Sequence, residues 1–266
     1  MKALKQNDVQ YVFVDEISMV PEMFYKFFIT MKRIKPEIKF IIAGDFEQLL
    51  PVNDRVEGCD YKNSHALYEL CDGNRLQLTT CRRSDDRLFN MLLKPNIGNI
   101  KATDFPEEFT QRHICFTNET RKKVNAVMMK QHAKKAKKNK SGILELSALD
   151  YSQNSQDVKL TAGTPLIARV NNKDHDICNN EMWVITKINK TKGTITIKEE
   201  DGDRTMDIDN NEVQKLFNPA WCITCHKSQG STYNHTYTIH EFSKMDNRMR
   251  YVALSRSTKV EFIRVW

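Results

Sequence analysis

The sequence predicts an α/β protein with two lobes built on parallel sheets and a small β insertion in the second lobe. Two short apolar runs, at 11–14 and 39–43, flank a segment with helical periodicity, and a similar strand–helix pattern restarts at residue 114. Short strand patterns with tight turns follow Thr164 and indicate the insertion. We expect a first lobe at 1–105 and a second at 106–266, with the insertion at about 171–215.

The charge of the chain is uneven. Forty-one basic and 34 acidic residues give a net charge of +7, and nine of the basic residues lie between Arg121 and Lys140, where there is no acid. The other 246 residues therefore hold 32 basic and 34 acidic side chains. This local basicity favours a polyanionic partner, and the alternative is a solvated helix face with no partner.

The sequence has no run of eighteen apolar residues and no hydrophobic signal core near Met1, so we expect a soluble, intracellular protein. Seven cysteines at irregular spacing are typical of reduced thiols. Residues 222–226 match the C-x-x-C-H pattern of haem attachment. Covalent haem attachment belongs to exported proteins, so we expect no haem here.

The first predicted strand, Tyr11–Val14, is wholly apolar and is expected to be buried on both faces of a parallel sheet. Asp15 and Glu16 follow it directly. Burying two unpaired carboxylates costs several kcal/mol, so they should emerge at the carboxyl edge of the sheet, where α/β proteins bind ligands. One carboxylate there can hold Mg²⁺ while its neighbour orients a water, as in a Walker B motif. The alternative is a strand end with two solvated acids.

A second strand is predicted at Lys39–Ala43, and the segment from Pro21 to Ile34 between the two strands is predicted to be a helix. Its apolar residues at helical spacing are Phe24, Phe27, Phe28, Met31 and Ile34. Strand, helix and strand make a right-handed crossover that places both strand ends side by side. We expect four polar side chains to converge at that edge: Asp15, Glu16, Asp45 and Gln48.

Further elements are predicted before the lobe boundary. A polar loop at 53–63 precedes a short helix at 66–71. Ser64 is expected to cap the start of this helix, and residues 72–74 to end it. A third strand is expected at 75–79, and Ser84 should cap a helix that carries Leu88, Phe89, Leu92 and Leu93. The adjacent Arg82 and Arg83 could reach a bound phosphate, or they are ordinary surface residues.

The second lobe is predicted to start with a strand at 114–116 and a helix from Thr117, whose Val124, Val127, Met128 and Gln131 share one face. A strand at 165–170 leads to a hairpin of 182–189 and 193–198 and then to a strand at 205–208. Residues 220–224 should return to a buried strand.

Five stretches together resemble the motifs of superfamily 1 helicases of the RecD/Dda type. The sequence TCHKSQGST at 224–232 resembles motif V, and YVALSRST at 251–258 resembles motif VI. DEISM at 15–19, GDFEQLLPV at 44–52 and residues 78–83 resemble motifs II, III and IV. The resemblance covers essentially the whole chain and implies two RecA-like lobes, the first one incomplete, with an SH3-like β insertion in the second. That insertion is typical of the branch that moves 5′ to 3′.

The resemblance also implies a role for each matching residue. Asp15 would hold Mg²⁺, Glu16 would polarise the attacking water and Gln48 would read the γ-phosphate of ATP. Arg82 and Arg256 would approach the same phosphate, as arginine fingers do. The resemblance further implies that Asp45 and Gly230 contact the nucleotide. It implies contacts with single-stranded DNA for Thr224, His226 and Lys227.

The chain departs from the family pattern at motif I, the phosphate loop. No Gly-Lys dipeptide occurs, and only fourteen residues precede Asp15. Without that loop most ATP affinity should be lost. We therefore expect an incomplete motor: a fragment, a split gene product or a degenerate paralogue, whose Walker A motif would come from another chain or an upstream segment. In motif IV, Cys81-Arg82-Arg83 stands for the usual Phe-Arg-Gln, which leaves the role of Arg83 open.

The predicted function is an ATP-dependent helicase or translocase on single-stranded DNA, moving 5′ to 3′. One alternative is an RNA helicase, since viral RNA helicases share these motifs, although the β insertion favours DNA. The other is a nucleic-acid-binding module that has lost catalysis. The residues of motifs II, III, IV and VI favour the motor, and the missing motif I favours the module.

Overall fold

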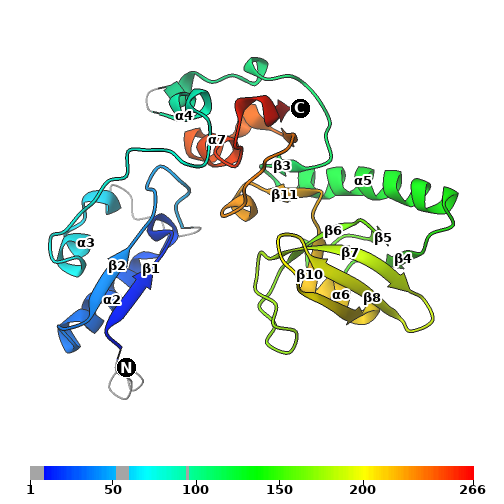
Figure 1. The fold of residues 1–266 in the computed structure, drawn as a ribbon, viewed down its shortest axis with the longest axis horizontal. Helices are drawn as coiled ribbons and strands as arrows, with labels where there is room; N and C mark the ends of the chain where they lie inside the picture. The colour runs from blue at the N-terminus through cyan, green and yellow to red at the C-terminus, as the bar shows by residue number, and fades with distance from the viewer. Residues whose placement is uncertain (1–8, 52–59, 94–95) are drawn as a thin grey trace. The chain divides into compact units, whose positions relative to one another are not determined.

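The computed structural model describes residues 9–51, 60–93 and 96–266, and the chain divides into two compact units (Figure 1). The first unit comprises the residues up to Gly98 together with Asp246–Ser255. The second comprises Asn99–Met245 and Arg256–Trp266. The chain thus passes between the two units three times. Parallel sheets with helices occur in the chain, which confirms the predicted α/β class.

The first unit is built on the predicted strand–helix–strand crossover. Strands β1 (Tyr11–Val14) and β2 (Lys39–Ile42) pair in parallel over their full length, and α2 (Glu22–Ile34) connects them. Pro21 precedes the first turn of α2, where its missing N–H leaves no hydrogen bond unmade. The helix packs on one face of the sheet around a core of Val14, Tyr25, Met31, Ile38 and Phe40.

The prediction that β1 is buried on both faces is wrong. Tyr11 is 56% exposed, Phe13 73% and Ile41 47%, so the apolar side chains that point away from α2 reach solvent. The apolar face of α2 is also narrower than predicted, because Phe24 and Phe27 are more than 40% exposed. A two-stranded sheet with one helix can cover only one of its faces, and an unbroken apolar run does not reveal which.

Two short helices follow in the first unit. Helix α3 (His65–Leu70) begins as predicted at Ser64, whose Oγ accepts a hydrogen bond from the Leu67 N–H at 3.4 Å. Gly73 closes it with a φ of 75° and donates its N–H to the Tyr68 carbonyl. Helix α4 (Asp86–Leu92) is capped by Asp85, which accepts from the Leu88 N–H at 2.7 Å. Asp85 therefore replaces the predicted Ser84.

The strand predicted at Arg75–Thr79 is absent. This stretch joins no sheet, and Leu76 and Leu78 are 95% and 93% exposed. Its alternating pattern suits a strand, but a strand forms only beside a partner, and the only ladder of the first unit's described residues joins β1 and β2. Most of the polar loop predicted at 53–63 lies outside the described residues; 61–63 form a short 3₁₀ helix, η2.

The second unit contains a four-stranded parallel sheet. Its strands β11 (Cys222–Thr224), β3 (His113–Cys115), β12 (Tyr237–Ile239) and β13 (Ile263–Val265) lie in that order. The strands predicted near 114 and 222 are therefore neighbours, in register from Cys222 opposite His113 to Thr224 opposite Cys115. This pairing brings the end of β11 beside the start of the helix that follows β3.

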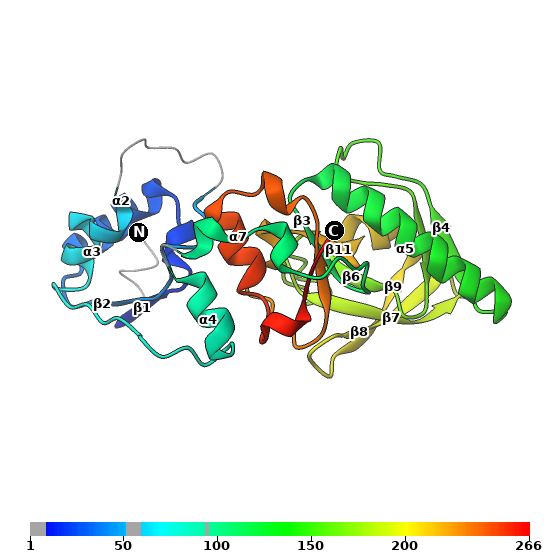
Figure 2. The ribbon, with the colours of Figure 1, turned by 90° about the horizontal axis from the view of Figure 1, so that it is seen from above.

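That helix, α5 (Asn118–Lys138), is capped by Thr117 and runs along β3, β11 and the strand β5 (Val158–Thr161) (Figures 1 and 2). Its buried face is rotated from the predicted one: Val124 and Met128 are buried, but Val127 and Gln131 are exposed. Arg121 also belongs to the buried face rather than to the solvated basic cluster. Its guanidinium donates to Asn118 Oδ1 and to the Asn154 carbonyl.

An antiparallel sheet makes up the rest of the second unit, together with the hairpin of β4 (Ile143–Leu146) and β5 (Val158–Thr161). Its strands are β6 (Pro165–Ala168), β7 (Met182–Asn189), β8 (Thr194–Glu199), β9 (Thr205–Asp209) and β10 (Phe217–Pro219). They lie in the order β10-β6-β7-β8-β9, and helix α6 (Asn210–Leu216) connects β9 to β10. The predicted hairpin is confirmed, and the sheet encloses the fully buried Trp183.

Within the described part of the chain, no helix combines the length and the apolar composition that a membrane span requires.

Candidate functional site

The two carboxylates of motif II follow β1 at the carboxyl edge of the first unit's sheet. Asp15 is exposed, and its Oδ1 accepts a hydrogen bond from the Glu16 N–H at 2.8 Å. Glu16 adopts a left-handed conformation with a φ of 49°, which turns the chain sharply into the 3₁₀ helix η1 (Ile17–Met19). Non-glycine residues with such a backbone are uncommon and gather at functional sites.

Motif III meets motif II through the backbone. The Ala43 N–H donates to the Val14 carbonyl at 2.8 Å, and the Ile17 N–H donates to the Ala43 carbonyl at 3.0 Å. Gly44 then passes so close to η1 that a Cβ on it would lie 2.7 Å from Ile17 N. Only glycine fits this crossing, so the Gly-Asp pair of motif III is fixed beside the Asp-Glu pair of motif II.

The motif III turn is held by its own first carboxylate. Asp45 Oδ1 accepts a hydrogen bond from the Glu47 N–H at 2.9 Å, and the Asp45 carbonyl accepts one from the Gln48 N–H at 3.1 Å. Gln48 is half-buried in this turn. Asp15, Glu16, Asp45 and Gln48 thus come together at one strand edge, in the arrangement that the crossover predicts.

Two residues of helix α7 (Asn247–Leu254) also hold this turn, and sequence reasoning did not single them out. The Tyr251 hydroxyl donates to Asp45 Oδ2 at 2.6 Å. Arg248 Nη1 donates to the Gln48 carbonyl at 2.9 Å and to the Phe46 carbonyl. Their spacing of three residues on the helix that leads into the motif VI arginine indicates that they share one helix face, but it does not indicate which segment that face contacts.

Arg82, the motif IV arginine, lies on the exposed irregular segment before α4. Among the described residues, no hydrogen bond given by the structure joins it to the edge that carries Asp15 and Glu16. Its role therefore stays a prediction.

Motif V lies in the second unit, directly after β11. Thr224 ends the strand, and its Oγ1 accepts from the Lys227 N–H at 3.4 Å across the 3₁₀ helix η5 (His226–Ser228). Lys227 Nζ donates to Asn179 Oδ1 at 2.9 Å and to Asn180 Oδ1, in the loop before β7. Burial, and then the charge of Arg169, lower the pKa of Lys227. The motif V lysine is thus tied to the antiparallel sheet.

The motif VI arginine is enclosed beside the end of motif V. Arg256 is only 1% exposed, and its Nη1 lies 3.5 Å from the Ser231 carbonyl. Its own carbonyl accepts from the Tyr233 N–H at 2.7 Å. Gly230, next to Ser231, has a φ of 83° and no heavy atom within 4 Å of the position that a Cβ would take. The two residues predicted to meet the nucleotide from the second unit therefore lie close together.

The donor set at the first unit's edge fits Mg²⁺ brought in on a nucleotide. Mg²⁺ is usually held by one or two carboxylates, with waters and phosphate oxygens completing the octahedron. Asp15 is exposed and supplies such a carboxylate. Among the described residues there is no group of three or more side chains that would hold a metal without a phosphate.

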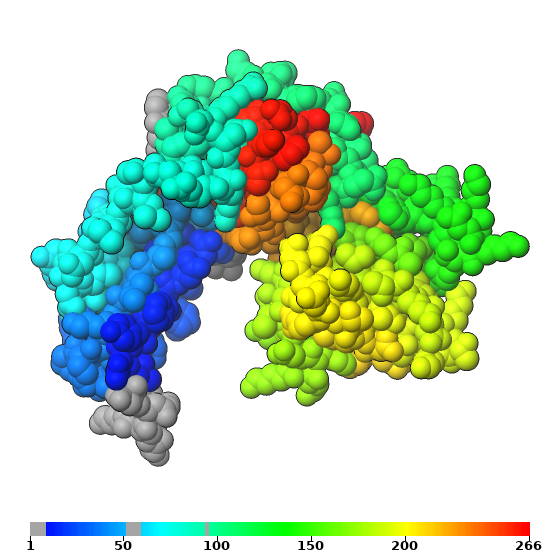
Figure 3. Space-filling view, in the orientation of Figure 1, coloured from blue at the N-terminus to red at the C-terminus, as the bar shows by residue number. Residues whose placement is uncertain are grey.

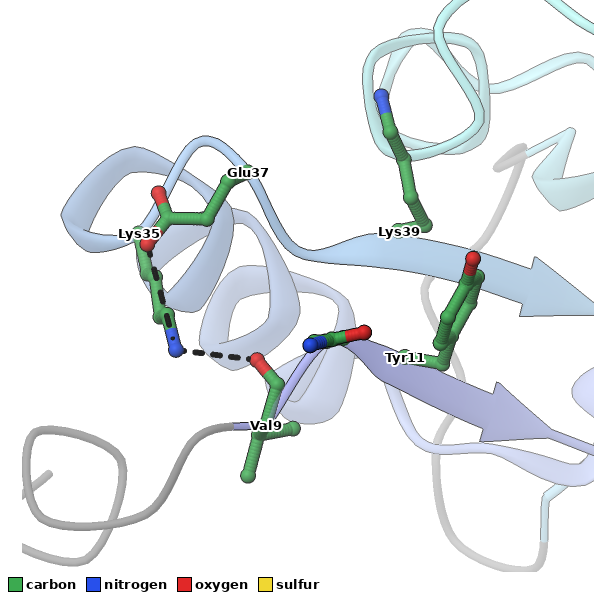
Figure 4. Close-up of a pocket in the computed structure, with 6 residues that line it drawn as sticks. Val9, Tyr11, Lys35, Glu37 and Lys39 are labelled. Atoms are coloured by element: carbon green, nitrogen blue, oxygen red, sulfur yellow. Dashed lines mark hydrogen bonds and ion pairs between the residues drawn. The ribbon is translucent and has the colours of Figure 1, made fainter.

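A shallow hollow lies at the other end of the same strands (Figure 4). Val9, Tyr11, Lys35, Glu37 and Lys39 line it with Gln10, and Lys35 Nζ donates to the Val9 carbonyl at 3.1 Å. It lies at the amino ends of β1 and β2, away from the motif II carboxylates, and we assign it no part in the site.

The fold of the chain resembles that of solved helicase structures. No family model and no curated protein matches the sequence. Solved structures of Pif1 helicases, however, match 99% of the chain. Pif1 from Bacteroides bound to ssDNA is 21% identical with a TM-score of 0.66, and the match covers 71% of that chain. Pif1 from Candida albicans is 18% identical with a TM-score of 0.65, over 74% of its chain.

A third match is a structure of DNA unwinding at forked dsDNA by two coordinating Pif1 helicases. It is 19% identical with a TM-score of 0.63, over 70% of that chain. The chain therefore shares the fold of these Pif1 structures, as the resemblance of its motifs predicts.

Proposed function

We propose that this chain carries part of an ATP-driven helicase or translocase that moves 5′ to 3′ on single-stranded DNA. The observation that supports this most is the crossing of Gly44 over η1, which fixes the motif II and motif III acids at one strand edge. The Pif1 fold around that edge adds to it. A Pif1 from Bacteroides with the same fold was solved in complex with ADP-AlF3 and ssDNA.

The residues take distinct roles in this proposal. Mg²⁺ bound by Asp15 would supply charge neutralisation on the β- and γ-phosphates. Glu16 accepts a proton from the attacking water and orients it, and Gln48 contacts the γ-phosphate. Asp45 keeps Gln48 in place through the turn that Tyr251 and Arg248 brace.

Arg82 and Arg256 provide positive charge where the transition state gathers negative charge. Gly230 allows the main chain to approach the nucleotide. Thr224, His226 and Lys227 contact the nucleic-acid backbone, and the link from Lys227 to Asn179 transmits movement of that strand to the antiparallel sheet.

We assign residues 1–105 to a first RecA-like lobe and 106–266 to a second, with an SH3-like insertion near 171–215. The five-stranded antiparallel sheet supports such an insertion, because it interrupts the chain between the strands β3 and β11 of one parallel sheet.

A second candidate is a nucleic-acid-binding module without catalysis. The observation that favours it is the absence of a Gly-Lys dipeptide from the sequence, since a phosphate loop needs that lysine. RNA in place of DNA remains the alternative within the helicase class.

ATP hydrolysis with and without an added phosphate loop distinguishes these functions. We expect the chain alone to show no DNA-stimulated hydrolysis, and a fusion to an upstream Walker A segment, or addition of a chain that carries one, to restore it. Arg256→Ala should then cut turnover by roughly 10³-fold or more with little change in ATP affinity. Glu16→Gln should abolish turnover.

The Glu47→Gln variant is the matched control, because Glu47 is the neighbouring acid that the proposal leaves without a chemical role. Restored turnover that survives Glu16→Gln would contradict the motor. Single-strand binding without any turnover in the restored protein would favour the module.

A further inference from the structure

The solvent face of α5 carries a row of lysines that the proposed motor does not use. Val124, Met128 and Ala136 face the core, so the other side of the helix faces solvent. At 3.6 residues per turn, positions 130, 134 and 137 fall within about 60° of one another, opposite the buried side. We define the lysine row as Lys130, Lys134, Lys137 and Lys138, all of which are exposed.

The charge of this row is not balanced locally. Lys123, nearly two turns earlier, pairs with Glu119 at 2.6 Å. From Thr120 to Leu144 the sequence has no acid. Among the residues that the structure describes, none forms a salt bridge with a lysine of the row. Four like charges over about 12 Å of helix repel one another, and a polyanion would relieve that repulsion.

The helix that carries the row suits contact with a phosphate backbone rather than with bases. Helix α5 has no Phe, Tyr or Trp, and the row stands on a convex helix whose last turns project from the second unit (Figure 3). Proteins that hold single strands use grooves and aromatic side chains on which bases stack. A duplex needs neither and offers one phosphate charge per ~1.7 Å of its axis, twice the density of one strand.

We propose that the lysine row binds the phosphate backbone of duplex DNA, as a site separate from the single-strand contacts of motif V. The two sites lie on different elements, since Thr224 and His226 belong to β11 and η5. The binding is independent of base sequence, because lysines that contact only phosphates carry no base readout. A protein that engages a junction gains from such a site, because it meets a duplex and a single strand at once.

Substitution of the whole row tests the proposal in the full chain. The row variant changes Lys130, Lys134, Lys137 and Lys138 to Gln, which keeps helix propensity nearly unchanged on an exposed face. The control variant changes Lys187, Lys190, Lys192 and Lys198 to Gln; these exposed lysines belong to β7, β8 and their turn, and the net charge falls equally. Fluorescence anisotropy with a short blunt duplex and with a single strand, over a series of KCl concentrations, measures both affinities.

We expect the row variant to bind the duplex at least about tenfold more weakly than the parent. Its slope of log K against log salt should shrink by about 0.9 for each phosphate that the protein no longer neutralises. The control variant should keep the parent's affinity within about twofold. A row of four Lys→Arg changes should retain binding, because the charges remain.

Duplex binding that is undetectable in the parent, or a duplex affinity that is unchanged in the row variant, would overturn the proposal. So would an equal loss of duplex affinity in the control variant. A loss of single-strand affinity in the row variant as large as its loss of duplex affinity would overturn it as well. A chain that fails to bind single strands at all would count against the proposed function. The duplex measurement would still decide the role of the lysine row.

Discussion

At the scale of single residues, the carboxyl edge of the first sheet depends on close backbone approach. Gly44 crosses η1 with no space for a side chain, and Glu16 takes up a left-handed backbone directly opposite. The sequence alone predicted which side chains gather there, because strand ends in a crossover must meet. It could not predict the bracing by Tyr251, because that hydrogen bond joins residues 206 positions apart.

Gly44→Ala should destabilise the first unit by about 1–3 kcal/mol, because the added methyl meets backbone that cannot move aside. Denaturant unfolding measures the loss. Gly98→Ala is the matched control, since its Cβ would find only the Asn247 side chain, at 3.5 Å. Equal losses in both variants would contradict the steric argument.

Two buried histidines in the second unit should make its stability depend on pH. His240 Nε2 and His113 Nδ1 share a hydrogen bond of 3.0 Å, and the Phe109 ring packs on His113. Burial lowers the pKa of His113 to about 3, and the nearby His240 contributes to that shift. Burial likewise lowers the pKa of His240 to about 4, although Glu241 opposes the shift.

Since both pKa values lie below the unfolded value near 6.5, stability is fully present above that pH and falls as the pH drops toward 4. At pH 5 the loss should be about 2 kcal/mol for each imidazole that must stay neutral. Thermal melts from pH 7.5 to 4.5 measure it. His240→Gln keeps a hydrogen-bonding group but removes one titration, so its melting temperature should fall less; identical pH profiles would show that the pair is not responsible.

At the scale of elements, the sequence predicted where helices begin and which segments form the strands of the parallel sheets. It was less successful at predicting whether a strand-like segment finds a partner strand. Ser64 and Thr117 cap helices where the sequence places them, because a capping side chain acts on an N–H only a few residues away. The stretch around Leu76 and Leu78 has the alternation of a strand but joins no sheet, since pairing depends on a distant neighbour. The predicted buried face of α5 was also rotated by about one residue from the observed one, because the neighbours against which the helix packs are distant in the sequence.

The start of α4 gives a direct comparison of two adjacent candidates. Asp85→Ala should cost about 1 kcal/mol, because it leaves the Leu88 N–H without its partner. Ser84→Ala should change stability by less than half as much, since among the described residues Ser84 Oγ hydrogen-bonds to Cys81 Sγ, at 3.3 Å, and not to a helix N–H. Denaturant midpoints of the two variants decide between them, and a larger loss at Ser84 would place the cap there instead.

At the scale of the whole molecule, the motifs and the fold lead to the same class from different information. Motifs V and VI are local patterns, and each is placed by a short parallel strand or by the helix that leads into it. What no local pattern specifies is the division of the chain into units, because it depends on which segments touch after folding. Helix α7 shows this, since it packs with the first unit although the segments on either side of it belong to the second.

The bond between Tyr251 and Asp45 links distant parts of the chain and can be tested alone. Tyr251→Phe removes one hydroxyl and should cost about 1 kcal/mol, because Asp45 is only half-buried and water replaces part of the bond. Equilibrium unfolding measures it, with Tyr151→Phe, 75% exposed, as the control. A neutral Tyr251→Phe would mean that the Arg248 hydrogen bonds hold the turn without it.

The threefold passage of the chain between the units has a consequence for biosynthesis. A ribosome releases residues up to Gly98 long before it makes Asp246–Ser255, so the first unit waits for its last helix until most of the second unit has been made. During that interval the Asp45 turn lacks the Tyr251 and Arg248 donors, and forming these hydrogen bonds requires closing a loop of about 200 residues. The second unit can gather most of its strands before α7 is made, but its sheet still waits for β13, which follows α7 in the chain. Each unit is therefore completed by a segment that is made after most of the other unit.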